Sequence, residues 1–305
     1  MNKVKYATRE EWIEARRHGI GASDSPAILG IGYANRGPAS VYSDKINGGA
    51  SDSDDMRLRV GQAMEPGLRS VLAAVTGLEI AAPEPFTIHR HSEHNWMTAT
   101  LDGETVTEDG ERAVVELKNV SNFSSSEWAD GAAPLAYEVQ VQHQMAVTNT
   151  TKGVLFALVG GNEPVVRRIE RNDKFIAALI VRLAGFWQGV LDKEMPEIDG
   201  TVATSEALSA IHPNDNGQAV ALSAEFAAMS EELKAAKESR KACTETIRAL
   251  ENKIKAAIGN NSYGVAGANV WSWLSSERKA YTVDARTVRT LRLRSSLPRG
   301  VSLAE

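Results

Sequence analysis

The sequence predicts an α/β protein that ends in a long helix and a small β-hairpin. Apolar strand segments occur in pairs around turn residues, at 97–106 with 113–120 and at 154–159 with 165–170. Amphipathic helical segments lie between and around these pairs, and the clearest of them runs from 135 to 148. These observations predict a sheet with flanking helices, followed by a helical extension.

The length of 305 residues exceeds that of a typical domain, so we expect more than one structural unit. We predict a principal domain at 1–200, a linker at 201–221, a heptad helix at 222–258 and a small basic C-terminal region at 259–305. A hairpin is expected within 263–274. The basic character of that region comes from seven Lys and Arg residues against one Asp between Arg278 and Arg299.

The heptad helix is predicted from apolar positions that recur in alternating steps of 4 and 3 from Phe226 to Ala257. Arg240 interrupts this seam. The pattern alone leaves open whether the seam packs against another helix of the same chain, another subunit or the C-terminal tail.

Composition excludes several classes of protein. The formal net charge of -5 does not fit a protein that coats nucleic acid non-specifically, although a local basic surface is compatible with it. A single cysteine, Cys243, excludes an intramolecular disulfide and a cysteine-rich zinc site. The N-terminus has no apolar signal core, and we expect a cytosolic protein.

The segment around residues 8–26 predicts a capped helix followed by a tight turn. Thr8 and Glu11 have the spacing of a capping box. The sequence 19–26, GIGASDSP, is a glycine-rich turn that leads into a helix start. Backbone amides at such a turn can bind a phosphate, although Ser and Asp at this position more often only cap a helix.

The strand Val114–Lys118 carries opposite charges on one face. Side chains alternate along a strand, so Glu116 and Lys118 project together from an apolar segment. A hairpin turn at 107–112 folds Asp102 back toward Glu116. Glu65 lies on the apolar stripe of a helix predicted over 56–76, so it too faces inward.

This set of residues suits magnesium-dependent hydrolysis of a phosphodiester. Mg²⁺ prefers one or two carboxylates together with water and substrate phosphate, and Asp102 and Glu116 supply carboxylates. Lys118 would favour the hydroxide form of the attacking water and balance the charge that develops. The alternative interpretation is an exposed Glu116–Lys118 ion pair on a surface hairpin, without a catalytic role.

Two other groups of residues have simpler interpretations. His89, His91 and His94 lie around a polar loop without an evident fourth ligand, so solvated histidines are favoured over a zinc site. Trp271 and Trp273 share a face of the predicted C-terminal hairpin. Covering a small core is the favoured role for them, and stacking on nucleic-acid bases is the alternative.

Five motifs occur in an order that resembles the YqaJ-like phage recombinases, a nuclease family that includes lambda exonuclease and falls within the PD-(D/E)xK superfamily. The motifs are Arg16 with GIGASD at 19–24, GQAMEP at 61–66, TLDG at 100–103, VELK at 115–118, and Pro134 with YEVQVQHQM at 137–145. The resemblance covers roughly residues 9–195. The family's usual Pro-Asp pair is Leu101-Asp102 here, a departure that preserves the carboxylate.

The resemblance implies a restriction-endonuclease-like fold, with a central mixed sheet flanked by helices. It also implies roles for individual residues. Asp102, Glu116 and the Leu117 carbonyl would bind Mg²⁺, for which Mn²⁺ is a possible substitute. Lys118 would be the catalytic lysine, with Glu65 assisting the metal or water and Gln140 orienting the site. Arg16, Ser23 and Thr100 would contact the 5′-phosphate of the DNA end.

The activity implied by this resemblance is a 5′→3′ exonuclease on linear double-stranded DNA, which produces 3′ single-stranded tails for phage-type recombination. Its expected partners are DNA ends and a single-strand annealing protein, in a bacterial host cytoplasm and without a membrane. A homo-oligomer, a trimer by resemblance, is also expected. The alternatives are an Mg²⁺-dependent endonuclease of the same superfamily and a non-catalytic DNA-binding or scaffold protein.

Overall fold

The computed structural model describes residues 2–32, 36–48, 56–129 and 131–277. The chain divides into two compact units, Met1–His212 and Pro213–Glu305, which we describe separately. The basic run that was predicted between Arg278 and Arg299 lies outside the described residues.

The first unit begins with a four-stranded sheet in the order β1-β4-β5-β2 and with short helices around it. Its strands are β1 (Asn2–Lys5), β2 (Ile20–Gly21), β4 (Thr87–Arg90) and β5 (Met97–Ala99). The helices that accompany them are α1 (Arg9–Arg17), the 3-10 turn η1 (Ala22–Asp24), α2 (Ser25–Ile28) and α3 (Pro38–Asn47). Thr8 is the N-cap of α1 as predicted and accepts from the Glu11 amide, but the Glu11 carboxylate accepts from the Ala7 amide and not from that of Thr8, so the second bond of the predicted capping box is displaced by one residue.

A five-stranded mixed sheet follows, in the order β3-β6-β7-β8-β9. Its strands are β3 (Ile80–Ala81), β6 (Gly103–Val106), β7 (Arg112–Val120), β8 (Lys152–Val159) and β9 (Glu163–Glu170). β7 and β8 are parallel, and η2 (Asn122–Trp128) and α5 (Leu135–Thr148) form the connection between them. The other pairs in this sheet are antiparallel.

One predicted strand is wrong in its extent. The segment 97–106 was expected to be continuous, but it forms β5 and β6, which belong to different sheets. The break falls at residues 100–102, and it takes Thr100 and Asp102 out of regular strand pairing. Both residues therefore lie where one sheet gives way to the other.

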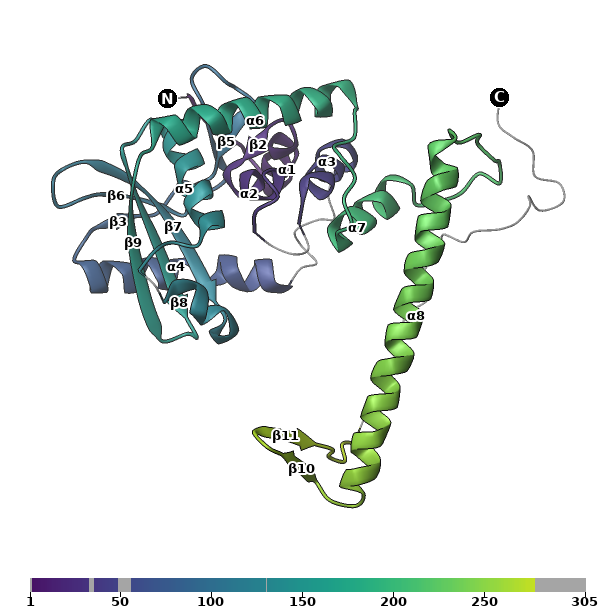
Figure 1. Cartoon of the computed structure of the whole chain (residues 1–305). Coiled ribbons are helices and arrows are strands. Elements are labelled where there is room, and N and C mark those ends of the chain that lie inside the picture. Colours follow the sequence, from purple (N-terminus) through teal and green to yellow (C-terminus); the bar gives the residue numbers. More distant parts are fainter. Residues whose placement is uncertain (1, 33–35, 49–55, 130, 278–305) are drawn as a thin grey trace. The chain divides into compact units, whose positions relative to one another are not determined.

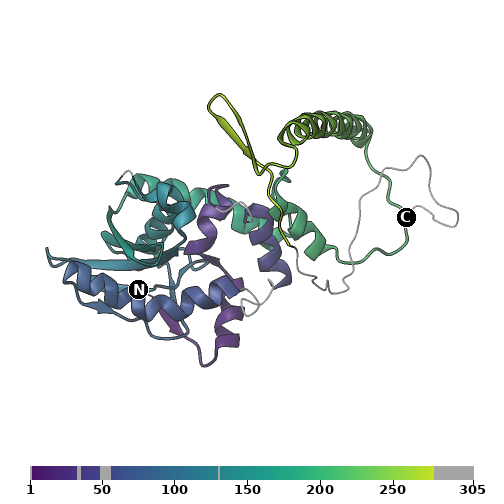
Figure 2. The ribbon, with the colours of Figure 1, turned by 90° about the horizontal axis from the view of Figure 1, so that it is seen from below.

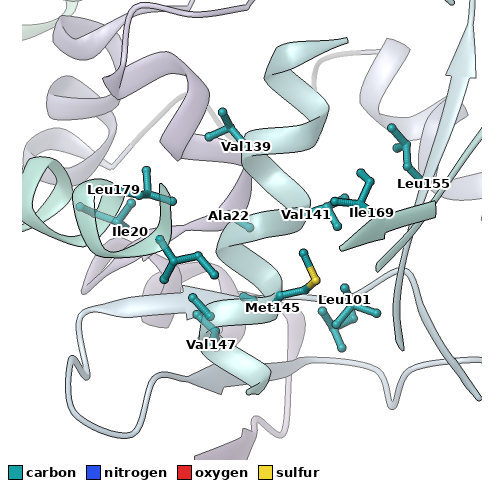
Figure 3. Close-up of a cluster of buried hydrophobic side chains, with 14 of the residues drawn as sticks. Ile20, Ala22, Leu101, Val139, Val141, Met145, Val147, Leu155, Ile169 and Leu179 are labelled. Carbon is teal, nitrogen blue, oxygen red and sulfur yellow. The ribbon is translucent and has the colours of Figure 1, made fainter. Parts of the chain in front are cut away.

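Helices cover both faces of the five-stranded sheet. On one face α5 packs over Val114, Leu155 and Ala157, and α6 (Asp173–Asp192) packs against α5 (Figure 1). The opposite face is covered by α4 (Met56–Thr76), as Figure 2 shows. This helix packs through Leu68 and Leu72. Figure 3 shows how side chains of α5, including Val141 and Met145, fill the larger cluster.

The approach of α5 to β8 is close because residue 153 is a glycine. A Cβ atom at Gly153 would collide with the Val141 side chain of α5. Any larger residue would push α5 away from the sheet. The position of the α5 side chains over β7 therefore depends on this contact.

By length and composition alone, α6 could cross a membrane. Its Ile176, Leu179 and Leu183 side chains are buried in the cluster over the sheet. We therefore interpret α6 as a core helix.

The end of the first unit and the second unit contain fewer elements. Helix α7 (Val202–Ile211) packs on α3 and belongs to the first unit. The second unit contains α8 (Glu225–Ile258) and the hairpin of β10 (Tyr263–Ala266) and β11 (Asn269–Ser272). The predicted α/β class, with its long C-terminal helix and its hairpin, is confirmed.

Candidate active site

The side chain of Glu116 is a buried carboxylate in the middle of the mixed sheet, with an exposed fraction of 2%. Gln140 donates to its Oε1 at 2.7 Å, and Gln144 donates to its Oε2 at 2.6 Å. Lys118 also donates to Oε1 and lies 3.2 Å from the Gln140 carbonyl oxygen, to which it donates as well. Each carboxylate oxygen is thus satisfied, as a buried charge requires.

These contacts follow from the periodicities of a strand and a helix. Glu116 and Lys118 are two residues apart on β7 and share the face that α5 covers. Gln140 and Gln144 are four residues apart on α5, so both amides point to the same place on that face. The ammonium of Lys118 also lies 5.0 Å from the centre of the Tyr137 ring of α5.

The side chain of Gln144 donates to Glu116, but one of its own polar atoms has no partner among the described residues. Its Nε2 serves the carboxylate, but its Oε1 is buried without a hydrogen-bond partner among the described residues. An unsatisfied buried acceptor costs about 1–3 kcal/mol. The hydrogen bonds in this region therefore satisfy the Glu116 carboxylate first, and the Gln144 carbonyl oxygen is left unpaired among the described residues.

Asp102 immediately precedes β6 and lies next to Glu116. The β6–β7 register pairs Gly103 with Val115, which brings Asp102 level with Glu116. Its Oδ2 accepts from the Leu117 amide at 2.9 Å. Burial and the negative charge of Glu116 raise the pKa of Asp102 well above its usual range. The pair thus carries more negative charge than the local hydrogen bonds compensate.

Glu65 joins the same group of acids from α4. Its carboxylate is half-buried and lies 3.7 Å from Arg69 one turn later. Arg69 also donates to the Asp102 carbonyl at 2.8 Å, which ties α4 to the break between β5 and β6. Burial and repulsion from Glu116 raise the pKa of Glu65, against the opposing effect of Arg69.

The carboxylates of Asp102 and Glu116, with the Leu117 carbonyl, fit a divalent cation. Within the described residues no group of three or more His, Cys, Asp or Glu side chains is arranged to hold a metal ion. Two carboxylates and a carbonyl are nevertheless what Mg²⁺ accepts, because it retains water and binds substrate phosphate. In a strand the amide and carbonyl of one residue point the same way, so the Leu117 carbonyl faces the Asp102 side. The raised pKa of Asp102 marks the negative charge that a cation would offset.

A second feature is a narrow pocket of about 20 Å³ beside this group. All three residues predicted to bind the 5′-phosphate line it, together with Gln140. The complete lining is Arg16, Gly21, Ala22, Ser23, Ile88, Thr98, Thr100 and Gln140. The sequence prediction that these three residues act together is thus consistent with their placement, although their role stays a prediction.

The wall of this pocket is fixed by a buried ionic network around Asp24. Its carboxylate lies 2.7 Å from Arg36 and 2.8 Å from Lys45, and it accepts from the Gly21 amide at 3.0 Å. Burial opposes ionisation, but the charges of Lys45 and Arg36 outweigh it and hold the pKa of Asp24 well below its usual range. Lys45 also donates to the Arg16 carbonyl at 3.1 Å, so the network holds both sides of the pocket.

His143 ties α5 to the same region. Its Nδ1 lies 2.6 Å from the Ser25 hydroxyl, and its Nε2 lies 2.9 Å from the Thr98 carbonyl. The ring is fully buried, and burial lowers the pKa of His143 to about 4. A neutral ring therefore joins α2, β5 and α5.

Sequence reasoning missed several residues that support the site. Gln144 was not among the predicted site residues. It lies four residues after Gln140 on the same helix, and this spacing was a signal that both amides reach the same place. Asp24 was expected only to cap a helix. Its carboxylate does accept from the Gly21 amide at the start of η1, but it also pairs with Lys45 and Arg36, which the sequence did not predict. That pairing, like the link from Arg69 to Asp102, joins segments far apart in the chain and leaves no local pattern.

Comparisons with known proteins place the chain in a family. Residues 11–151 match the YqaJ-like viral recombinase domain. The chain is 30% identical over 278 residues to "Uncharacterized protein YqaJ" of Bacillus subtilis (strain 168), which covers 90% of this chain and 85% of that protein.

Similar folds are found among solved structures. An alkaline exonuclease of Laribacter hongkongensis, LHK-Exo, has a TM-score of 0.50 at 20% identity, covering 61% of this chain and 94% of its own. The structure of LHK-Exo in complex with dAMP has the same TM-score at 21% identity, with the same coverage of both chains. At such identities the likeness concerns the fold.

The pKa of His143 predicts a loss of stability in mild acid. The folded protein keeps this ring neutral down to about pH 4, whereas the unfolded chain binds a proton below about pH 6.5. The free energy of unfolding should therefore fall by about 3 kcal/mol as the pH drops from about 6.5 to about 4. Urea unfolding across this range checks it in the native protein and in His143→Gln. A decline that is equally steep in both proteins would contradict the assignment, and the exposed His18→Gln serves as the control.

Proposed function

The chain belongs to the YqaJ-like viral recombinase family, and from this membership and the Glu116 centre we propose that it is an Mg²⁺-dependent 5′→3′ exonuclease. It would act on linear double-stranded DNA and leave 3′ single-stranded tails. A single-strand annealing protein would then use these tails in phage-type recombination in the bacterial cytoplasm.

The position of Gln140 is the observation that carries this proposal. Its amide donates to Glu116 at 2.7 Å, and the same side chain lines the pocket of Arg16, Ser23 and Thr100. A terminal phosphate in that pocket would thus lie one side chain away from the acidic centre. This arrangement favours a cut measured from a DNA end, which is what an exonuclease makes.

Each residue of the centre has a chemical role in this proposal. Asp102, Glu116 and the Leu117 carbonyl would hold Mg²⁺ or Mn²⁺, which when bound polarises the scissile phosphate and makes its water more acidic. Lys118 is held beside the site by Glu116 and Gln140, where its charge stabilises a hydroxide nucleophile and the pentavalent phosphate. Glu65, with its raised pKa, is suited to exchange a proton with water or the leaving group.

The phosphate pocket would select the end of the substrate. Arg16 supplies positive charge, and its guanidinium is also held 4.8 Å from the centre of the Trp12 ring. Ser23 and Thr100 supply hydroxyl donors. A dianionic 5′-phosphate can use all three groups, whereas a 5′-hydroxyl end cannot.

An endonuclease of the same superfamily is the main alternative, because one fold supports several modes of cutting. Covalently closed circular duplex DNA separates the two. An exonuclease leaves it intact, and an endonuclease cuts it. Assembly into a trimer that encloses the DNA is part of the proposal, by resemblance to lambda exonuclease.

Replacing Lys118 with alanine should reduce nucleotide release from linear duplex DNA about 100- to 1000-fold in the presence of Mg²⁺, because a charge aimed at the reacting phosphate is lost. Release of labelled nucleotides measures this directly. Lys174→Ala, which alters an exposed lysine at the start of α6, should retain full activity. Equal rates for Lys118→Ala and the native protein at unchanged melting temperature would refute the site.

Replacing Arg16 with alanine should abolish a preference for phosphorylated ends. The native protein should degrade 5′-phosphorylated duplexes faster than 5′-hydroxyl duplexes. Arg16→Ala should slow only the former, by about tenfold to a hundredfold, since a charged hydrogen bond contributes about 1.5–3 kcal/mol. Arg182→Ala on the exposed side of α6 is the matched control. An equal loss on both substrates would mean that Arg16 does not bind the end phosphate.

A further inference from the structure

Helix α8 presents a long apolar seam that the described part of its own unit, up to residue 277, leaves exposed. The hairpin contacts only the C-terminal end of the helix, where Gly264 packs on the buried Ile258. Further along the seam, among the described residues, large side chains remain 41–57% exposed, namely Phe226, Met229, Leu233, Ile247 and Leu250. An apolar stripe of this length on a helix indicates a partner.

We propose that a second copy of this chain covers the seam, and that the two α8 helices pair antiparallel as a coiled coil. This inference does not depend on the nuclease activity. The sequence left three candidates for the partner, and the size and charge of the side chains along α8 are complementary to a second copy of the same helix.

The heptad assignment follows from the alternating steps of 4 and 3. The a positions are Phe226, Leu233, Arg240, Ile247 and Ile254, and the d positions are Met229, Ala236, Cys243, Leu250 and Ala257. In a parallel pair in register, every seam residue would face its own copy. The two Arg240 guanidinium groups would then meet in the apolar seam, which is unfavourable for like charges.

An antiparallel pair reduces this conflict, because it moves the two Arg240 side chains out of one layer into neighbouring layers, three residues or about 4.5 Å apart along the axis. Full overlap of the seams places each a residue level with a d residue of the other helix. Arg240 then lies level with Cys243 of the second copy, and Phe226 lies level with Ala257. Leu233 meets Leu250, Met229 meets Ile254 and Ala236 meets Ile247, so no layer consists of two alanines or of two phenylalanines, as it would in a parallel pair.

The charges beside the seam also favour the antiparallel arrangement. On one flank, Glu225 and Glu232 lie in the first half of α8 and Lys253 lies in the second half. On the other flank the order is reversed, with Lys237 before Glu251. Antiparallel pairing brings first halves against second halves. Glu232 of one copy therefore faces Lys253 of the other, and Lys237 of one copy lies on the same flank as Glu251 of the other.

The oligomeric state of the full-length protein is the first test. Light scattering should give a particle whose mass is halved by Leu250→Glu, because a charge is placed in the seam. If the trimer proposed above forms, paired α8 helices would join two trimers and the variant would leave one. Ala249→Glu, on the outer surface of the same helix, should leave the mass unchanged. A mass that Leu250→Glu does not change would overturn the proposal, and it would place the partner within the chain. A fall to one third of the native mass would overturn it in favour of a trimeric coil.

Pulsed electron paramagnetic resonance tests the direction of the helices. Spin labels are placed at Glu231→Cys or Glu245→Cys, both on the outer face, in full-length protein that carries Cys243→Ala. Antiparallel pairing separates the two labels at 231 by about 30 Å along the axis and those at 245 by about 10 Å, from 1.5 Å per residue. Equal distances at the two sites would show a parallel pair in register and contradict the proposal.

Discussion

The rest of the site depends on the burial of the Glu116 carboxylate inside an apolar sheet. A buried charge is tolerated only when its oxygens are paired, and Gln140, Gln144 and Lys118 supply the donors. This requirement fixes the rotation of α5 over β7. It also explains why the Gln144 carbonyl oxygen is left without a partner among the described residues, since the charge outweighs that loss.

The same constraint connects the acidic centre to the phosphate pocket. Gln140 belongs to both, and His143 on the same helix holds α2 and β5 in place around the pocket. The opposite wall is held by Asp24 through its ion pair with Lys45. Moving α5 would thus alter the centre and the pocket together. In the proposed function, α5 would therefore couple recognition of a DNA end to cleavage.

Much of the fold was predictable because it is encoded locally. Alternation along β7 placed Glu116 and Lys118 on one face, and the turn before it brought Asp102 close. The split between β5 and β6 was not predictable, because the apolar pattern of 97–106 is continuous and only pairing with two different sheets interrupts it. The Asp24–Lys45 ion pair was not predictable for a similar reason, because it joins residues 21 positions apart that meet only in the folded chain.

The central claim is that Asp102 and Glu116 form a cation site that is built before DNA arrives. Calorimetric titration of the DNA-free protein with Mn²⁺ tests it most directly, with Asp102→Asn as the variant and Asp192→Asn, on an exposed helix end, as the control. The native protein and the control should bind the ion equally, and Asp102→Asn should bind it at least about tenfold more weakly, as loss of a charged ligand requires. Equal affinity in all three folded proteins would contradict the claim.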